Sequence, residues 1–245
     1  MKKTILFVAM ALAGFCPSLF AQSSKLHFGS KQNNDAIENW KYVADNNKND
    51  EHDWAKAVYR EFPLSSADEI QHRYVINATD TFKVSMVMGL TKMWLEKAFA
   101  TPNDSIQVYD VDQRVIKAKV YLLGLGDAYG FGGFAATSSE AHVTIPMELT
   151  FQFKENRLRY EARIATFILN SSDWVKDVVN KSIPVTECYP VKSNSGHKDS
   201  FSRAFINCNA KCLTSCRDYI NYLNTHFGDK VKPQLQPKKS VDDEW

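Results

Sequence analysis

The sequence predicts an α+β domain in which a five-stranded antiparallel sheet packs against two helices. Apolar and polar residues alternate along two consecutive arms between Ala141 and Leu169, a pattern typical of half-buried strands. Residues 81–99 and 201–227 carry apolar side chains at three- and four-residue intervals, as amphipathic helices do. Together with three shorter alternating segments, these features predict the order strand, helix, four strands, helix.

The two alternating arms predict the central hairpin of the sheet, with Glu155-Asn156 as its turn. A tight turn there places apolar residues opposite one another and Glu148 opposite Arg163. The expected apolar pairs are Phe153–Leu158, Phe151–Tyr160, Leu149–Ala162 and Met147–Ile164. A shift of one residue would expose a whole apolar row, so the pattern fixes the register. We also expect Ile168 on the apolar side of the second arm. Pro146 cannot donate to a ladder and predicts a bulge or a free edge in the first arm.

Residues 1–21 predict a signal peptide, because Lys2 and Lys3 precede a largely apolar run that ends at Ala21. We therefore expect an exported protein that is periplasmic, displayed at the cell surface or secreted. The run is also close to the length of a bilayer span, so an uncleaved anchor is the alternative. Cys16 follows Phe15, where a lipoprotein signal needs a small residue, which argues against lipidation. The remaining sequence predicts no transmembrane segment after signal cleavage.

Three further regions follow the signal peptide. Residues 22–65 predict a polar N-terminal extension with one or two short helices, of which Asp50–Phe62 has the clearer helical spacing. Residues 66–228 predict the folded domain. Residues 229–245 contain two prolines and several charges and predict a disordered tail.

Within the domain, each element has its own pattern. Glu69–Asn77 alternates and predicts the first strand. A helix capped by Asp80 or Thr81 follows it, and Thr101-Pro102 ends that helix. Ile106–Tyr109 and Val115–Leu123 predict two strands joined by a turn at residues 110–113.

The two connections around the hairpin and the last helix complete the chain. Residues 124–140 predict a glycine-rich loop, and residues 170–200 an irregular connection with one or two helical turns at Ser172–Asn180. The last helix has an apolar face formed by Phe201, Phe205, Cys208, Cys212, Cys216, Tyr219, Ile220, Leu223 and Phe227, and Gly228 can end it.

The hairpin turn carries the most recognisable motif, a lysine and a tight turn followed by Arg-x-Arg-Tyr, at Lys154–Tyr160. Together with Trp94-Leu95, and with Asp110 and Asp112 before Val115-Ile116, this motif resembles the exported bacterial family of domains of unknown function with a fold like the TATA-binding protein. The resemblance covers residues 66–167 and implies that TBP-like fold. It implies no catalytic residue, cofactor or substrate. Asn156 stands where the family often has glycine, and asparagine tolerates the left-handed backbone, so we expect the turn to be preserved.

The charge balance argues against nucleic acid as a partner. The chain has 30 basic and 28 acidic residues, and cleavage of the signal peptide removes Lys2 and Lys3, which leaves 28 of each. Phosphate binding draws on a large basic excess, which a neutral chain lacks. Likeness to the TATA-binding protein is a likeness of fold and does not confer DNA binding.

Four cysteines of the domain suggest a disulfide. Cys208, Cys212 and Cys216 are spaced four residues apart and Cys188 lies upstream, an even number in an exported protein. Side chains at i and i+4 of a regular helix have poor disulfide geometry, so a bridge would involve Cys188 or a bent helix. The alternative is that the cysteines are small buried apolar side chains. The spacing matches no reliable zinc motif, and we expect no metal and no cofactor.

The glycine-rich loop is a candidate binding segment. Gly124–Gly130 superficially resembles a dinucleotide loop, but no helix follows it, so we do not expect nucleotide binding. A simple strand connection is the main interpretation. Its aromatic residues Tyr129, Phe131 and Phe134, if exposed, are candidates for contact with a partner or a membrane surface.

Arg157, Arg159 and Arg163, with Lys154, predict a basic row on the outward face of the hairpin. One interpretation is a solvated sheet face partly paired with Glu148 and Glu161. The other is a platform for an anionic ligand or an acidic partner, since arginine binds carboxylates well. His72 lies on the apolar side of the first strand, where a satisfied core residue is the expectation.

The function that these patterns favour is a non-enzymatic binding or interaction module that uses the open sheet face and the aromatic loop. Its partner would be a protein, a glycan or a small-molecule ligand of unknown identity. The alternatives are an enzyme, either a hydrolase with an unrecognised site or a thiol redox protein, and an envelope component that assembles with itself.

Overall fold

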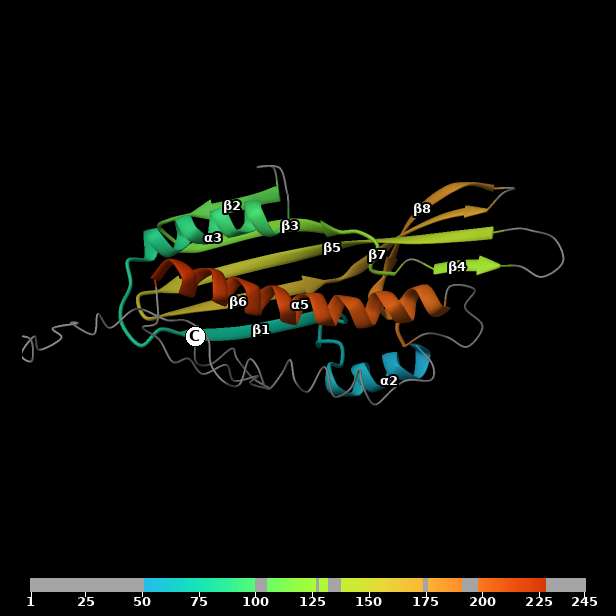
Figure 1. Cartoon of the computed structure of the whole chain (residues 1–245), viewed down its shortest axis with the longest axis horizontal. Coiled ribbons are helices and arrows are strands. Elements are labelled where there is room, and N and C mark those ends of the chain that lie inside the picture. The colour runs from blue at the N-terminus through green and yellow to red at the C-terminus, as the bar shows by residue number, and fades with distance from the viewer. Residues whose placement is uncertain are drawn as a thin grey trace, which may run out of the picture.

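An antiparallel sheet with helices packed against one of its faces forms the described part of the chain (Figure 1). The structure, a computed structural model, describes residues 51–99, 105–126, 128–131, 138–173, 176–190 and 198–227. The helices are α2 (Glu51–Glu61), α3 (Val84–Ala98), α4 (Val185–Cys188) and α5 (Lys198–Phe227). The strands are β1 (Ile70–Asn77), β2 (Ile106–Asp110), β3 (Val115–Leu122), β4 (Ala128–Phe131), β5 (Ser138–Lys154), β6 (Arg157–Ile164), β7 (Thr166–Asp173) and β8 (Lys176–Pro184). The predicted signal peptide, most of the predicted extension and the predicted tail lie outside these residues.

The five predicted strands form the path β1-β6-β5-β3-β2, and every neighbouring pair is antiparallel. This confirms the predicted α+β class and the predicted strands. The sheet has eight strands rather than five, because β4 and β7 pair with the first part of β5 and β8 pairs with β7. β5 is 17 residues long, which gives it room for neighbours at both ends.

The central hairpin of β5 and β6 has the predicted register. Phe153 faces Leu158, Phe151 faces Tyr160, Leu149 faces Ala162 and Glu148 faces Arg163. The apolar residues of both strands are buried on the face that the helices cover. Asn156 is not among the described residues with a positive φ. The turn therefore does not use the left-handed backbone conformation that glycine, common at this position in the resembling family, would favour.

A bulge separates β6 from β7 and corrects one prediction. Glu148 faces Arg163 and Thr144 faces Ile168, so four steps along β5 correspond to five along the partner. Pro146 lies opposite this irregularity, but the extra residue is in the second arm and β5 pairs continuously with β3 through Pro146, so the predicted bulge or free edge in the first arm is wrong. The extra residue shifts the alternation by one, so at the start of β7 the odd-numbered residues face the core. Phe167 and Leu169 are therefore buried, and Ile168 is only half-buried. The expectation that Ile168 continues the apolar row is wrong.

Helices α3 and α5 run antiparallel over the sheet and share its core. The hydroxyl of Tyr219 lies 2.6 Å from Oγ1 of Thr91, which donates to the carbonyl oxygen of Val87. The ring of Trp94 lies 4.9 Å from that of Tyr219, measured between centroids. The predicted apolar face of α5 is buried as far as Leu223. Helix α2 confirms the predicted helix at Asp50–Phe62 and packs on α5, so part of the predicted extension belongs to the core.

The start of α3 differs from the prediction. Lys83 is the N-cap residue, and no side chain caps the helix by a hydrogen bond. Asp80 accepts instead from the backbone N–H of Thr81 at 2.8 Å, which stabilises the preceding loop. The predicted capping role of Asp80 or Thr81 is therefore wrong.

Two predicted connections contain strands. Residues 170–200 include the end of β7, all of β8 and α4, so the predicted helical turns at Ser172–Asn180 are wrong. Residues 124–140 include β4, which pairs with the start of β5. Gly126 is buried where this segment crosses α5, and a Cβ atom there would lie 2.9 Å from the Cβ atoms of Ala204 and Val143, so only glycine fits.

Candidate functional site

The four cysteines of the domain are free, buried thiols. The predicted disulfide is therefore wrong, and the cysteines are small buried apolar side chains, which was the alternative interpretation. Cys208, Cys212 and Cys216 project from one face of the regular helix α5, where side chains four residues apart do not reach disulfide geometry. The Sγ atom of Cys212 lies 3.9 Å from Sδ of Met147. Within the described segments, no three His, Cys, Asp or Glu side chains gather as a metal site.

Burial controls the chemistry of these thiols. It raises the pKa of Cys188 and of Cys212 to about 12, and it raises the pKa values of Cys208 and Cys216 as well. Since the thiolate is the reactive form, these cysteines lack the property that a redox nucleophile needs.

We therefore expect the four thiols to resist alkylation in the folded protein. N-ethylmaleimide should label none of them under native conditions and all four in denaturant, because only unfolding exposes them. Peptide mass mapping of labelled protein gives the result for each cysteine. Rapid native labelling of any of the four would contradict the buried-thiol interpretation.

His72 is a satisfied core residue, as predicted. Its side chain is 4% exposed. Nε2 lies 2.8 Å from Oδ1 of Asn209 and Nδ1 lies 2.9 Å from the hydroxyl of Tyr74. Because Oδ1 can only accept, Nε2 carries the proton and Nδ1 accepts from Tyr74. Both ring nitrogens are thus satisfied by a neutral imidazole.

The predicted basic row lies on the sheet face opposite the helices. On that face, its arginines Arg159 and Arg163 bind side chains of neighbouring segments. Arg163 makes two hydrogen bonds to the carboxylate of Glu69, at 2.7 and 2.9 Å, rather than pairing with Glu148. Arg73 binds Glu161 at 3.1 Å. Arg159 donates to Oε1 of Gln152, the residue opposite it on β5. Lys154 faces Arg157, so basic character is concentrated at the turn end of the hairpin.

The predicted aromatic loop is described only in part. Tyr129 and Phe131 belong to β4, and their backbone pairs with Glu140 and Ser138 of β5. Phe134 lies outside the described residues. In the described part of this segment, β4 follows Gly126, where a dinucleotide loop would need a helix.

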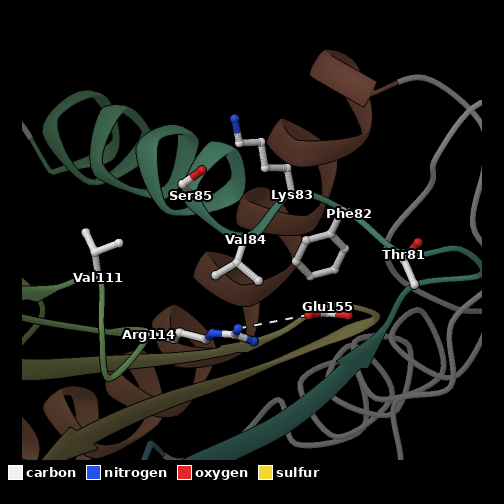
Figure 2. A pocket seen from close by; sticks show the side chains of 8 residues that line it. All are labelled: Thr81, Phe82, Lys83, Val84, Ser85, Val111, Arg114 and Glu155. Atoms are coloured by element: carbon white, nitrogen blue, oxygen red, sulfur yellow. Dashed lines mark ion pairs between the residues drawn. The ribbon is translucent and has the colours of Figure 1, made fainter.

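A pocket of about 440 Å³ lies where the first turn of α3 meets two hairpin turns of the sheet. Its lining comes from three separate segments: Thr81, Phe82, Lys83, Val84, Ser85, Val111, Arg114 and Glu155. Figure 2 shows Phe82 and Val84 pointing toward Arg114, whose guanidinium extends toward Glu155. Nη2 of Arg114 lies 4.0 Å from Oε1 of Glu155, and both side chains are largely exposed. The pocket therefore combines apolar walls with cationic groups.

The family-like motif at Lys154–Tyr160 builds this pocket through its backbone. The N–H of Phe82 donates to the carbonyl oxygen of Glu155 at 2.6 Å, and that of Ala78 to Asn156 at 2.6 Å. The N–H of Phe153 donates to the carbonyl oxygen of Arg114 at 3.0 Å. These three bonds clamp the β5–β6 turn between the loop before α3 and the β2–β3 turn. Arg114 has a φ of 57°, a left-handed conformation that costs a non-glycine residue about 1 kcal/mol.

Exposed large apolar side chains occur on α3, β2 and β3, and one of them, Val111, also lines this pocket. Those that are exposed among the described side chains all belong to α3, β2, β3 or the residue directly after β2 or β3. We define them as the apolar edge: Met86, Met93, Val108, Tyr109, Val111, Tyr121 and Leu123, with exposed fractions of 37% to 72%. β2 ends the strand path of the sheet, so its outer backbone edge faces away from β3. No sequence pattern marked this edge, because exposure depends on how far α3 covers β2 and β3.

The comparisons with known proteins give two solved structures. The chain is similar to a TBP-like protein from Parabacteroides distasonis ATCC 8503, with a TM-score of 0.43, 12% identity, and coverage of 66% of this chain and 95% of that chain. It is also similar to a DUF4468 family protein from Bacteroides ovatus ATCC 8483, with a TM-score of 0.36, 11% identity, and coverage of 75% and 98%. Both are bacterial, and the first is described as TBP-like. No family description and no curated protein matches the chain.

Proposed function

We propose that the protein is an exported, non-enzymatic binding module that holds an extended segment of a partner protein against its apolar edge. The observation that carries the proposal is the concentration of exposed apolar side chains on α3, β2 and β3. Exposed apolar side chains on neighbouring elements make this part of the domain a candidate interaction surface. The signal-like residues 1–21 support export.

The geometry of β2 supports a strand as the bound element. An edge strand has a row of backbone groups that an extended peptide can pair with, which supplies affinity independent of sequence. Tyr109 faces Ile116, on the helix-covered face, and Val108 faces Lys117, on the opposite face. A partner strand would therefore meet an apolar side chain on each of its two faces, and this alternation would supply the specificity.

The charge around the apolar edge favours an acidic partner. From Lys83 to Ala98 and from Ile106 to Leu122 there are six basic and three acidic residues. The basic residues are Lys83, Lys92, Lys97, Arg114, Lys117 and Lys119, and the acidic ones are Glu96, Asp110 and Asp112. This excess would speed association with an acidic segment and weaken as salt is added.

The other predicted functions have less support. A thiol redox enzyme needs accessible thiolates, and the cysteines are buried with raised pKa values. Self-assembly would use the same apolar edge with a second copy as partner, and it is distinguished by a mass that rises with protein concentration. The basic row at the turn end of the hairpin is the rival binding surface.

Two variants separate the apolar edge from the basic row. Val108→Lys/Tyr109→Ser places a charge on the edge strand and removes the aromatic contact. Arg157→Gln/Arg159→Gln removes two charges from the rival surface. We expect native mass spectrometry of protein purified from the exporting cell to show a partner complex with the wild type and the arginine variant, and its loss with the edge variant. Loss with the arginine variant alone would refute the proposal.

A further inference from the structure

The pocket at the start of α3 has the chemistry of a site for an acidic, aromatic segment. Phe82, Val84 and Val111 supply apolar lining, and Lys83 and Arg114 supply positive charge (Figure 2). Glu155 is the only acid in the lining, and its pair with Arg114 is long and exposed. Such pairs contribute little to stability, so a second carboxylate can share the guanidinium.

The chain itself contains a segment of this composition. Asp242, Asp243 and Glu244 are consecutive acids and Trp245 follows them. The aromatic ring suits the apolar lining, and the three carboxylates complement the two cations. No comparable run of three acids occurs elsewhere in the sequence.

The helix register places the end of α5, where the connecting chain begins, beside the pocket. Thr91 on α3 contacts Tyr219 on α5. Phe99, eight residues after Thr91, contacts Lys211, eight residues before Tyr219: Nζ of Lys211 lies 5.6 Å from the centroid of the Phe99 ring. Eight residues in the other direction, the same antiparallel register brings Phe227 beside Lys83. Figure 1 shows α5 ending next to the start of α3.

The connecting chain is long enough to return to the pocket. Residues 228–241 separate α5 from Asp242, and 14 extended residues reach at most about 50 Å. Helices packed side by side are about 8 to 10 Å apart, so the span to be covered is much shorter than this reach. Tethering at that distance gives the acidic segment a high effective concentration at its own pocket.

We infer that Asp242–Trp245 binds in the pocket formed by Phe82, Val84, Val111 and Arg114 of the same chain. The aromatic ring packs on the apolar lining, and the carboxylates bind the Arg114 guanidinium and the Lys83 ammonium. This inference does not depend on the proposed partner, because it is tested on the protein alone.

Zero-length crosslinking of the full chain tests it. A carbodiimide joins a lysine amine to a carboxylate in direct contact, and peptide mass spectrometry identifies the pair. We expect the peptide with Asp242–Glu244 to be joined to Lys83 in preference to Lys92 and Lys97, which lie further along α3. In a mixture of ¹⁵N-labelled and unlabelled protein, the joined peptides should be entirely heavy or entirely light.

Matched variants show whether the pocket directs the contact. Arg114→Asn removes the guanidinium and keeps a residue that tolerates the left-handed backbone, and Lys117→Gln removes one charge from the opposite sheet face. Since one exposed pair contributes up to about 1 kcal/mol, Arg114→Asn should lower the Lys83 crosslink roughly fivefold, with Lys117→Gln near wild type. Equal crosslinking to all three lysines, mixed heavy and light pairs, or equal loss in both variants would overturn the inference.

Discussion

Replacing Phe151 with alanine should lower the free energy of unfolding by about 3 to 5 kcal/mol. Phe151 is fully buried near the end of β5 that leads into the hairpin turn. Its ring lies 5.1 Å from that of Tyr219 on α5, 5.4 Å from Tyr160 on β6 and 6.1 Å from Trp94 on α3, measured between centroids. The substitution therefore leaves a cavity at the point where both helices meet the hairpin. Urea denaturation measures the loss.

Tyr121→Ala is the matched control, because it also removes an aromatic ring from a strand but its side chain is 56% exposed. We expect it to cost less than about 1 kcal/mol. Phe151→Leu, which leaves a smaller cavity, should cost about 1.5 kcal/mol and gives a result if the alanine variant does not fold. Equal losses for Phe151→Ala and Tyr121→Ala would mean that this aromatic cluster is not the centre of the core.

Acidification should destabilise the protein through His72. Burial lowers the pKa of His72 to about 4, partly offset by its hydrogen bond to Asn209. The unfolded chain takes up a proton near its ordinary pKa of about 6.5, while the folded protein takes it up only near pH 4. Between those values the unfolded state binds more protons, so the free energy of unfolding falls as pH falls. The expected loss is about 3 kcal/mol in total.

His72→Gln isolates this contribution from other titrating groups, since its amide can donate to Asn209 and accept from Tyr74 without charging. The stability of the wild type relative to the variant should decrease by about 3 kcal/mol between pH 7 and pH 4. Denaturant titrations of both proteins at several pH values measure the difference. Parallel pH dependences would show that His72 is not held neutral.

The hairpin was predictable because its alternation is strict and leaves one register that buries every apolar residue. The bulge at the end of β6 was not, since Ile168 fits the alternation as well as Phe167 until a partner strand is known. β7 and β8 contain Asn, Ser, Asp and Lys, which predict strands poorly, and they form because β5 extends beyond its other partners. The sequence correctly placed the α5 cysteines on the apolar face of the helix. Sequence spacing could not show whether Cys188 lies close enough to them to form a disulfide.

The pocket was not predictable for a similar reason. Its residues come from segments centred near positions 83, 112 and 155, and backbone hydrogen bonds across the turns bring them together. The motif at Lys154–Tyr160 was recognised as a sequence feature, while its role in holding the loop before α3 depends on the amides of Ala78 and Phe82. Neither amide has a sequence signature.

Photo-crosslinking along β2 tests the central claim most directly. A photoreactive amino acid is placed at Val108 or Tyr109 on the edge strand, or at Arg159 on the rival surface, and activated in the exporting cell. Our account predicts adducts from both β2 positions to residues of a single extended partner segment, and few from Arg159. Adducts from Arg159 with none from Val108 or Tyr109 would contradict it and assign binding to the open sheet face.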